Sequence, residues 1–377
     1  MKYYLIAGEA SGDLHGSNLI KEVRKYDPAA DFRIWGGDMM QTAGGTLVKH
    51  YKDLAFMGFI EVVKNLPAIF RNLKFAKEDI KNYKPDVLVL IDYPGFNLRM
   101  AKWAKENNIK VVFYISPQVW AWKASRVNQI KKYVDKMLVI LPFEKQFYKQ
   151  REYNVEYVGH PLVEVISNFK QEAAGISAHT HSIKKTESNI IALLPGSRKQ
   201  ELKTKLPIML EVAKYFPSYQ FIVAKAPGVD DAFYSSFLSS YKNVNSVSGK
   251  TYDLLLNADA ALVTSGTATL ETALFGVPQV VCYKGSEISY QIAKRIISIK
   301  YISLVNLIMD KQVVRELIQN DLTVENLRNE LHKILSDEVY IKRMKDDYDE
   351  LKKLLTAGGN ASENAAKIII EFTSSAA

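Results

Sequence analysis

The feature that most constrains the fold of this chain is the alternation of short apolar runs with longer amphipathic stretches. In the first half, Asn18–Tyr26, Pro67–Tyr83 and Leu98–Asn107 carry apolar residues at helical spacing. They lie between short runs that we predict to be strands: Lys2–Ala7, Phe32–Trp35, Val87–Ile91, Val111–Ile115, Met137–Ile140 and Glu156–Val158. Apolar strands that alternate with helices form a parallel sheet covered on both faces. The sequence therefore predicts an α/β fold.

The same pattern restarts in the second half, after the polar stretch Asn168–Ser188, which we interpret as the segment between domains, with room for a short helix. The predicted strands are Ile190–Leu194, Gln220–Ala224, Val244–Val247, Ala260–Val263 and Gln279–Cys282, and the predicted helices are Lys203–Tyr215, Tyr252–Asn257 and Thr269–Phe275. We predict two doubly wound, Rossmann-like domains, residues 1–165 and 166–359, that face each other across a cleft. The last amphipathic stretch, within residues 360–377, is expected to pack back on the first domain.

Composition excludes several classes of protein. The 377 residues are 47% hydrophobic and 24% charged, which is typical of a globular chain. No apolar run approaches the ~18 residues of a membrane span, and a single cysteine, Cys282, excludes an internal disulfide. Motifs typical of dinucleotide, P-loop, serine-hydrolase and zinc-protease sites are missing. We therefore expect a cytoplasmic protein without a metal or other cofactor.

The chain is basic, with 50 Lys and Arg against 41 Asp and Glu, a net charge of +9. Such an excess favours an acidic partner: nucleic acid, an anionic membrane surface or a phosphorylated substrate. No zinc-finger spacing or RNA-binding aromatic motif accompanies the charge, so nucleic acid is not expected.

Two loops of the first half carry candidate functional residues. GEASGDLHG follows the first strand; there Gly12 would let the backbone approach a ligand and Ser11 would cap the next helix, although a plain tight turn also fits. Asp92 follows Val87–Ile91, at the end of a buried strand. Partial desolvation would raise its pKa toward that of a useful general base. The alternative is that Asp92 only caps the following turn.

In the second half, the loop LLPGSR carries a candidate phosphate ligand. Ser197 and Gln200 have capping-box spacing, which would leave Arg198 in the first helical turn. A basic residue there opposes the helix dipole, and a bound diphosphate would explain its presence.

A second anion site is predicted from the loop SGTATLE, where small hydroxyls and a glycine precede a helix: Ser265, Gly266 and Thr267. Glu271, one turn further on, would bind the ribose hydroxyls of a nucleotide, or would be an ordinary acid near a helix start. Together with Arg198, these residues predict one diphosphate held between two loops.

One stretch of the first half combines apolar residues with basic ones. Its apolar residues are Phe56, Met57, Phe59, Ile60, Leu66, Ile69 and Phe70, and several lysines and arginines follow. A basic amphipathic segment is typical of peripheral membrane binding. The alternative is a core helix with a solvated face.

The motifs GEASGDLHG, MGFIEV, PDVLVLIDYPGFN, YISPQVWAWK, LPFEK, VGHPL, LLPGSRKQEL, SGTATLE and VNLI occur in this order along the chain. Together they closely resemble the lipid-A-disaccharide synthase family of GT-B-type glycosyltransferases. The resemblance runs from Tyr4 to about Gln319, and the residues after Gln319 show little of it.

The resemblance implies an inverting transfer of 2,3-diacylglucosamine from UDP-2,3-diacylglucosamine to 2,3-diacylglucosamine 1-phosphate. The products would be a β-1,6-linked disaccharide 1-phosphate and UDP. It also implies peripheral association with the inner membrane and a role in lipopolysaccharide and outer-membrane biogenesis. It leaves open whether the chain is a monomer or a homodimer.

The resemblance also assigns residues. Asp92 corresponds to the family's proposed base and Arg198 to its phosphate-binding arginine. Gly95 stands where members often carry a second acid, so Asp92 would act alone or with His15. The other substrate-binding positions of the family correspond to Glu9, Ser11 and Asn306.

Two other readings of the sequence remain. The chain could be another GT-B enzyme that acts on UDP-N-acetylglucosamine, either a soluble-acceptor transferase or a 2-epimerase. Such an enzyme would explain Arg198 and Glu271 but not the apolar segment Phe56–Phe70. A non-catalytic lipid or nucleotide-sugar binding protein would leave Asp92 dispensable.

Overall fold

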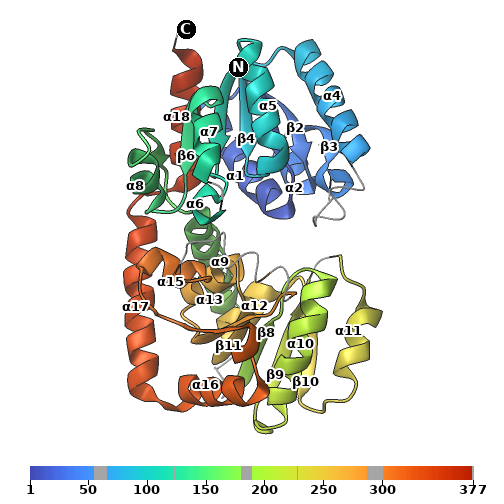
Figure 1. The fold of residues 1–377 in the computed structure, drawn as a ribbon, viewed down its shortest axis with the longest axis vertical. Helices are drawn as coiled ribbons and strands as arrows, with labels where there is room; N and C mark the ends of the chain where they lie inside the picture. Colours follow the sequence, from blue (N-terminus) through green and yellow to red (C-terminus); the bar gives the residue numbers. More distant parts are fainter. Residues whose placement is uncertain are drawn as a thin grey trace. The chain divides into compact units, whose positions relative to one another are not determined.

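The computed structural model describes residues 1–54, 66–122, 124–179, 189–226, 228–286, 290 and 300–375. The chain divides into two compact units (Figure 1). Unit 1 comprises Met1–Pro161 and Leu355–Ala377, and unit 2 comprises Leu162–Leu354. Each unit is a parallel sheet with helices packed against it, as the alternation of apolar runs predicts.

The sheet of unit 1 has the strand order β3-β2-β1-β4-β5-β6-β7. Its strands are β1 (Lys2–Ala7), β2 (Asp31–Gly36), β3 (Thr46–His50), β4 (Val87–Ile91), β5 (Lys110–Tyr114), β6 (Lys136–Val139) and β7 (Glu156–Tyr157). Alternate residues of the strands point to opposite faces, and both faces are buried. Because both faces are covered, the central strand β4 is apolar and buried at every position.

The helices of unit 1 cover the two faces of this sheet (Figure 1). One face packs against α4 (Leu66–Tyr83), α5 (Pro94–Glu106) and α7 (Val127–Tyr133), and the other against α1 (Ala10–Tyr26) and α18 (Ala361–Ser374). Shorter elements complete the unit: α2 (Asp38–Thr42), η1 (Tyr51–Leu54), α6 (Val119–Trp122), η2 (Ala124–Arg126) and α8 (Glu144–Lys149).

The C-terminal helix α18 is part of unit 1, far in sequence from its neighbours. Its buried Ala365 and Ile369 share a core with Leu19 of α1. Lys110 caps the helix, donating from Nζ to the carbonyl oxygens of Phe372 and Thr373 at 3.1 and 3.0 Å. A cation at a helix C-terminus is favoured by the helix dipole.

The sheet of unit 2 has the order β10-β9-β8-β11-β12-β13. Its strands are β8 (Ile190–Leu194), β9 (Gln220–Lys225), β10 (Val244–Ser248), β11 (Ala260–Thr264), β12 (Gln279–Tyr283) and β13 (Arg315–Ile318). The other elements are α9 (Pro161–His179), α10 (Lys199–Ala213), α11 (Asp231–Leu238), α12 (Thr251–Asn257), α13 (Thr267–Phe275), α15 (Leu304–Met309), η3 (Gln319–Asp321), α16 (Val324–Ser336) and α17 (Glu338–Thr356).

Every strand predicted from an apolar run is present, with its ends shifted by one residue at most. The strands β3 and β13 were missed. Both lie at sheet edges and carry charged residues, as edge strands commonly do, so they show no apolar run.

The interpretation of residues 168–188 as a segment between domains is wrong for its described part. Residues 161–179 form the helix α9. Phe169 packs against Tyr252 and Phe275, and Lys170 Nζ donates to the carbonyl oxygen of Leu274 at 2.9 Å. The helix therefore belongs to unit 2, and residues 180–188 lie outside the described residues.

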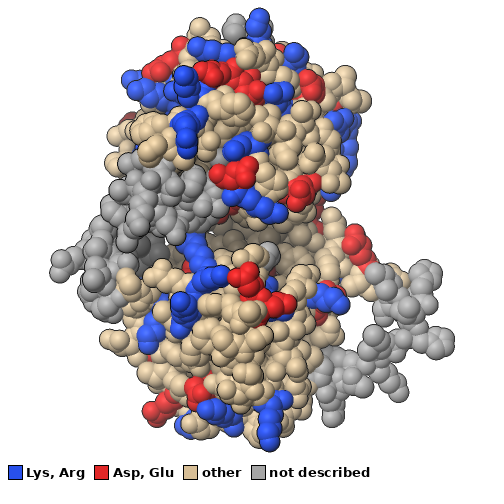
Figure 2. All heavy atoms as spheres, turned by 90° about the vertical axis from the view of Figure 1, so that its right-hand side faces the viewer, with Lys and Arg blue, Asp and Glu red and all other residues tan. Residues whose placement is uncertain are grey.

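Within the described part of the chain, no helix is long and apolar enough to cross a membrane. On the face shown in Figure 2, basic and acidic side chains are intermingled.

Candidate functional site

The loops predicted to carry chemistry follow the two central strands of each sheet. In unit 1, β1 and β4 are neighbours at the point where the strand order reverses, and their ends, Ala7 and Ile91, lie opposite each other. In unit 2, β8 and β11 occupy the same position. In open α/β sheets, ligands bind at the carboxyl ends of strands at such a switch point. Topology therefore selects the loops that contain Glu9, Asp92, Arg198 and Ser265.

The loop after β4 has a strained backbone. Asp92 and Tyr93 have φ values of 45° and 50°, in the left-handed region that residues with a Cβ adopt at a cost. The buried side chain of Asn97 holds this loop, because its Nδ2 donates to the carbonyl oxygens of Ile91 and Asp92 at 3.2 and 2.8 Å. Packing thus fixes Asp92 at the end of the strand instead of leaving it in an ordinary turn.

The environment of Asp92 favours its neutral form. Burial raises the pKa of this carboxyl to about 7, and the nearby negative charge of Glu9 adds to the rise. The backbone N–H of Tyr93 opposes the shift. A carboxylate with a pKa near the working pH is well suited to accept a proton from a substrate hydroxyl.

Two histidines lie close together in unit 1. Burial lowers the pKa of His15 to about 4. Burial lowers the pKa of His160 to about 3, and the proximity of His15 contributes. Both imidazoles are therefore neutral near pH 7. His160, in the VGHPL motif, was not singled out from the sequence.

The first loop differs from the prediction in two respects. The helix α1 begins at Ala10 with Glu9 at its N-cap, so the exposed Ser11 lies inside the first turn and does not cap it. Gly12 is buried, and a Cβ there would lie 3.0 Å from the Cβ of Ala7. Its role in this structure is therefore close packing of α1 on β1. Direct contact of Gly12 with a ligand is not supported.

Gly8 explains how Tyr93 is placed. A Cβ on Gly8 would lie 2.3 Å from the Tyr93 ring. Only glycine lets this ring lie against the backbone of the first loop. The loops after β1 and β4 are thus in direct contact, which brings Glu9 and Asp92 close together.

In unit 2, Arg198 is the N-cap of α10, which begins at Lys199. The predicted capping box is wrong, because no side chain caps the helix and the exposed Ser197 precedes the cap. Gly196 has a φ of 119°, and a Cβ there would lie 2.3 Å from Glu201 Oε2. This glycine turns the chain so that the exposed Arg198 stands at the start of the helix, beside the end of β8.

A buried lysine, missed from the sequence, links the two loops of unit 2. Lys205 Nζ donates to Thr264 Oγ1, at the end of β11, and lies 3.6 Å from Glu201 Oε2. Burial lowers its pKa, and Glu201 opposes the shift. Its position between Leu202 and Leu206 on the apolar side of α10 was the available signal. The lysine places a cation, partnered by Glu201, next to the loops where a diphosphate is predicted.

The second loop of unit 2 ends at the helix α13. Gly266 is its N-cap with a φ of 139°, and Thr267 is exposed at the first helical position. Ser265 Oγ donates to the carbonyl oxygen of Ile302 at 2.8 Å, so its hydroxyl fixes a neighbouring loop. Glu271 accepts a bond of 2.9 Å from the Tyr252 hydroxyl, and burial raises its pKa.

Asn306 is fully buried and its amide is occupied within the protein. Its Oδ1 accepts from the N–H groups of Val313 and Val314 at 2.8 and 3.0 Å. Its Nδ2 donates to the carbonyl oxygen of Val314 and to Glu316 Oε1, both at 2.9 Å. These bonds argue against direct contact of Asn306 with substrate. Asn306 instead holds the segment that contacts Ser265.

Replacing Asn306 by alanine would leave several buried groups without partners. An unsatisfied buried polar group costs about 1–3 kcal/mol, so we expect Asn306→Ala to lower the free energy of unfolding by about 3 kcal/mol. Urea denaturation checks this. The matched control is Asn326→Ala, an exposed asparagine whose Nδ2 donates to the carbonyl oxygen of Asp321. Equal, small losses in both variants would contradict the buried network.

The helix α4 places two of the apolar residues predicted to bind the membrane in different environments. Phe70 is 60% exposed, whereas Ile69 packs against the core beside the buried Leu73. Contact of Ile69 with a membrane is therefore not supported. Phe56, Met57, Phe59 and Ile60 lie outside the described residues, as does the side chain of Leu66.

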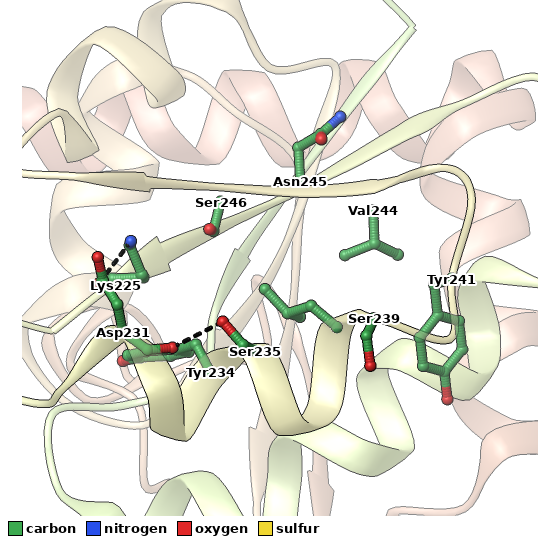
Figure 3. Close-up of a pocket in the computed structure, with 10 residues that line it drawn as sticks. Lys225, Asp231, Tyr234, Ser235, Ser239, Tyr241, Val244, Asn245 and Ser246 are labelled. Carbon is green, nitrogen blue, oxygen red and sulfur yellow. Dashed lines mark hydrogen bonds and ion pairs between the residues drawn. The ribbon is translucent and has the colours of Figure 1, made fainter.

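A cavity of about 490 Å³ lies elsewhere in unit 2, between the edge strand β10 and α11 (Figure 3). Its cation, Lys225, is paired with Asp231 at 2.7 Å. No residue selected above lines it. No group of three or more possible metal ligands was found among the residues that the structure describes.

Comparison with known proteins decides the family. A family model described as lipid-A-disaccharide synthetase matches residues 3–370. The lipid-A-disaccharide synthase of Geobacter metallireducens is 38% identical over 373 residues, covering 98% of this chain and 96% of the relative. That of Nitrosococcus oceani is 39% identical over 375 residues, covering 98% and 94%. The chain belongs to the lipid-A-disaccharide synthase family.

Solved structures show that this family member has the GT-B fold. The UDP-GlcNAc 2-epimerase of Neisseria meningitidis, bound to UDP-GlcNAc, matches with a TM-score of 0.67 at 15% identity over 99% of each chain. The glycotransferase of kitacinnamycin matches with a TM-score of 0.66 at 16% identity over 98% of each chain. Transferases and epimerases share this fold, so the fold does not distinguish between them. The family match does. This member of the lipid-A-disaccharide synthase family is a glycosyltransferase of lipid A biosynthesis.

Proposed function

We propose that the enzyme transfers 2,3-diacylglucosamine from its UDP carrier to 2,3-diacylglucosamine 1-phosphate with inversion. The observation that carries the proposal is the carboxyl of Asp92, which lies at the switch point of unit 1 with its pKa raised to about 7. Inverting transfer needs one base, and it needs stabilisation of the charge that develops on the leaving group.

Asp92 would take the proton from the acceptor 6-hydroxyl as the oxygen attacks the anomeric carbon. The bond from that carbon to the diphosphate breaks, and its electron pair leaves with UDP. A base is most effective when its pKa is close to the operating pH, which favours Asp92 over His15, whose pKa is near 4. We therefore propose Asp92 as the base and unit 1 as the part that binds the acceptor.

Unit 2 would bind the UDP part of the donor. Arg198 and the N–H groups at the start of α13 would stabilise the diphosphate. Lys205, which contacts Thr264 and lies 3.6 Å from Glu201, would be a further cation beside these loops. Glu271 would accept a ribose hydroxyl alongside its bond from Tyr252.

The first test is UDP release by the purified protein in detergent micelles, with the diacylated donor and with or without the acceptor. We expect release that depends on the acceptor. Turnover of UDP-N-acetylglucosamine without any acceptor would instead support an epimerase, and binding of the donor with no release under any condition would support a non-catalytic binding protein.

We also propose peripheral contact of α4 with an anionic membrane surface. The inner face of the helix is already fixed by Leu73 in the core and by the paired Arg33 and Asp79, whose Nη2 and Oδ1 are 2.6 Å apart. Packing on the sheet therefore does not account for the outward Phe70. The exposed Arg71 and Lys74 beside it add the positive charge that an anionic lipid surface attracts.

Phe59→Ser combined with Phe70→Ser should weaken binding to vesicles that contain anionic lipid. Burying one aromatic side chain is worth about 1.5–3 kcal/mol, so we expect a loss of roughly tenfold or more. Cosedimentation with anionic and with neutral vesicles measures it. Tyr215→Ser, which removes an aromatic ring 54% exposed on unit 2, is the control. If the double variant binds as the control does, membrane contact through this segment is wrong.

A further inference from the structure

A cavity of about 480 Å³ opens in unit 1 beside the loop that carries Asp92. Its wall includes Pro94 and Gly95, which directly follow that loop at the start of α5. Three cations from two separate segments also line it: Arg99, Lys102 and Arg126. Pockets of roughly 300–1,000 Å³ accept small ligands or their head groups.

The charged residues that line this cavity are all basic. One of them, Lys102, has its Nζ 3.9 Å from Oε1 of Glu106, which is not part of the lining. No acidic residue is among the described residues that line it. Arg126 is half-buried, and its pKa is lowered by burial and by the positive charge of Arg99. Two guanidinium groups held close together repel each other, and a bound anion would remove that repulsion. Guanidinium groups also match the oxygens of a phosphate in a bidentate way.

The fold holds these groups in place. The helices α5 and α7 pack together on the sheet, with Ala101, Ala104 and Ile130 in the shared core. Arg99 projects from α5 and donates to the carbonyl oxygen of Gly95. Arg126 precedes α7, which begins at Val127. The cationic cavity is therefore set by two packed helices.

We propose that this cavity binds the 1-phosphate of the acceptor, an inference that rests on the proposed function. In a glucosamine 1-phosphate, the phosphate is on C1 and the 6-hydroxyl is on the exocyclic carbon attached to C5, and C1 and C5 both flank the ring oxygen. A phosphate held by Arg99, Lys102 and Arg126 would anchor the sugar beside the Asp92 loop and restrict the positions open to its 6-hydroxyl. The diphosphate of the donor has its own cations in unit 2. The cavity would thus make the enzyme select a phosphorylated acceptor.

The test compares the wild type with Arg99→Gln, Arg126→Gln and the double variant in neutral detergent micelles without phospholipid. KM is measured for the donor, for the acceptor and for 2,3-diacylglucosamine lacking the phosphate. We expect the double variant to raise KM for the phosphorylated acceptor by roughly tenfold to a hundredfold, because a charge-assisted hydrogen bond contributes about 1.5–3 kcal/mol. KM for the donor should stay within about twofold, and the preference for the phosphorylated acceptor should largely disappear.

Arg328→Gln, the same substitution on α16 of unit 2, is the control and should change none of these constants. Arg126→Lys, which keeps the charge, should recover part of the lost preference. An unchanged preference in an active double variant would overturn the proposal. So would a defect that appears only with anionic phospholipid vesicles, since the arginines would then contact lipid head groups. Absence of acceptor-dependent release in the wild type would instead refute the proposed function.

Discussion

Asp92→Asn is expected to reduce kcat by about 10²–10⁴, the usual contribution of a positioned general base. The amide has nearly the shape of the carboxylate, so KM for both substrates should change little. Turnover is measured by acceptor-dependent UDP release. Full activity in this variant would rule out Asp92 as the base and would return attention to His15.

The same assignment fixes the pH dependence. Only the ionised carboxylate accepts a proton, and burial raises the pKa of Asp92 to about 7. In the wild type, kcat/KM should therefore fall as the pH drops below about 7 and level off above it. Glu9→Gln should move this limb to lower pH, because the charge of Glu9 contributes to the raised pKa. A profile that does not respond to Glu9→Gln would contradict the proximity of the two carboxyls.

As the pH rises, the stability of the wild type should fall while its activity rises. The folded state binds a proton at Asp92 more tightly than the unfolded state, in which the pKa is near 3.8. The free energy of unfolding of the wild type therefore loses a contribution as the pH rises from about 4 to about 7. Asp92→Asn has no such loss and should be more stable than the wild type at pH 8, by at most about 4 kcal/mol, but not at pH 4. Thermal melts at both pH values measure this.

Arg198→Ala should lower kcat by about 10²–10³, the cost of removing one group that stabilises developing charge. UDP should also become a weaker inhibitor, because the guanidinium would bind the diphosphate of the product. Arg198→Lys keeps the charge but not the bidentate geometry, so its kcat should lie between those of Arg198→Ala and the wild type.

The matched control for Arg198 is its neighbour in sequence. Lys199→Ala removes an exposed cation from the same helix start, but Lys199 Nζ is paired with Asp230 at 3.0 Å. We expect that variant to keep nearly full turnover. If both variants lose activity equally, the loss reflects the general charge of the helix start. An active Arg198→Ala enzyme with unchanged inhibition by UDP would place the diphosphate elsewhere.

The sequence was sufficient to predict the core strands of both sheets and the order of the candidate functional loops along the chain. Central parallel strands are buried on both faces, so Lys2–Ala7, Val87–Ile91 and Ile190–Leu194 stand out as apolar runs. A loop at the end of such a strand can then be assigned to the ligand-binding edge without any structure. The same rule selected Asp92 before its surroundings were known, whereas Arg198 was selected because a basic residue near a helix start opposes the helix dipole.

Side-chain environments could not be deduced in this way. Asn306 matches a family asparagine, yet its amide is occupied by Val313, Val314 and Glu316, whose backbone and side-chain groups converge on it only after folding. Lys205 is one of many lysines in the sequence, and its contact with Thr264 depends on how α10 packs beside β11.

The sequence by itself determined the fold class, the core strands of each half and the residue types offered for chemistry, because apolar periodicity and loop position are local properties. The sequence predicted the direction of the pKa shift of Asp92, whereas the tertiary structure alone decided its size, the contribution of Glu9, the neutral pair of histidines and the cluster of Arg99 with Arg126. Burial and charge proximity depend on residues that are distant along the chain, and these become neighbours only when the sheet and its helices pack together.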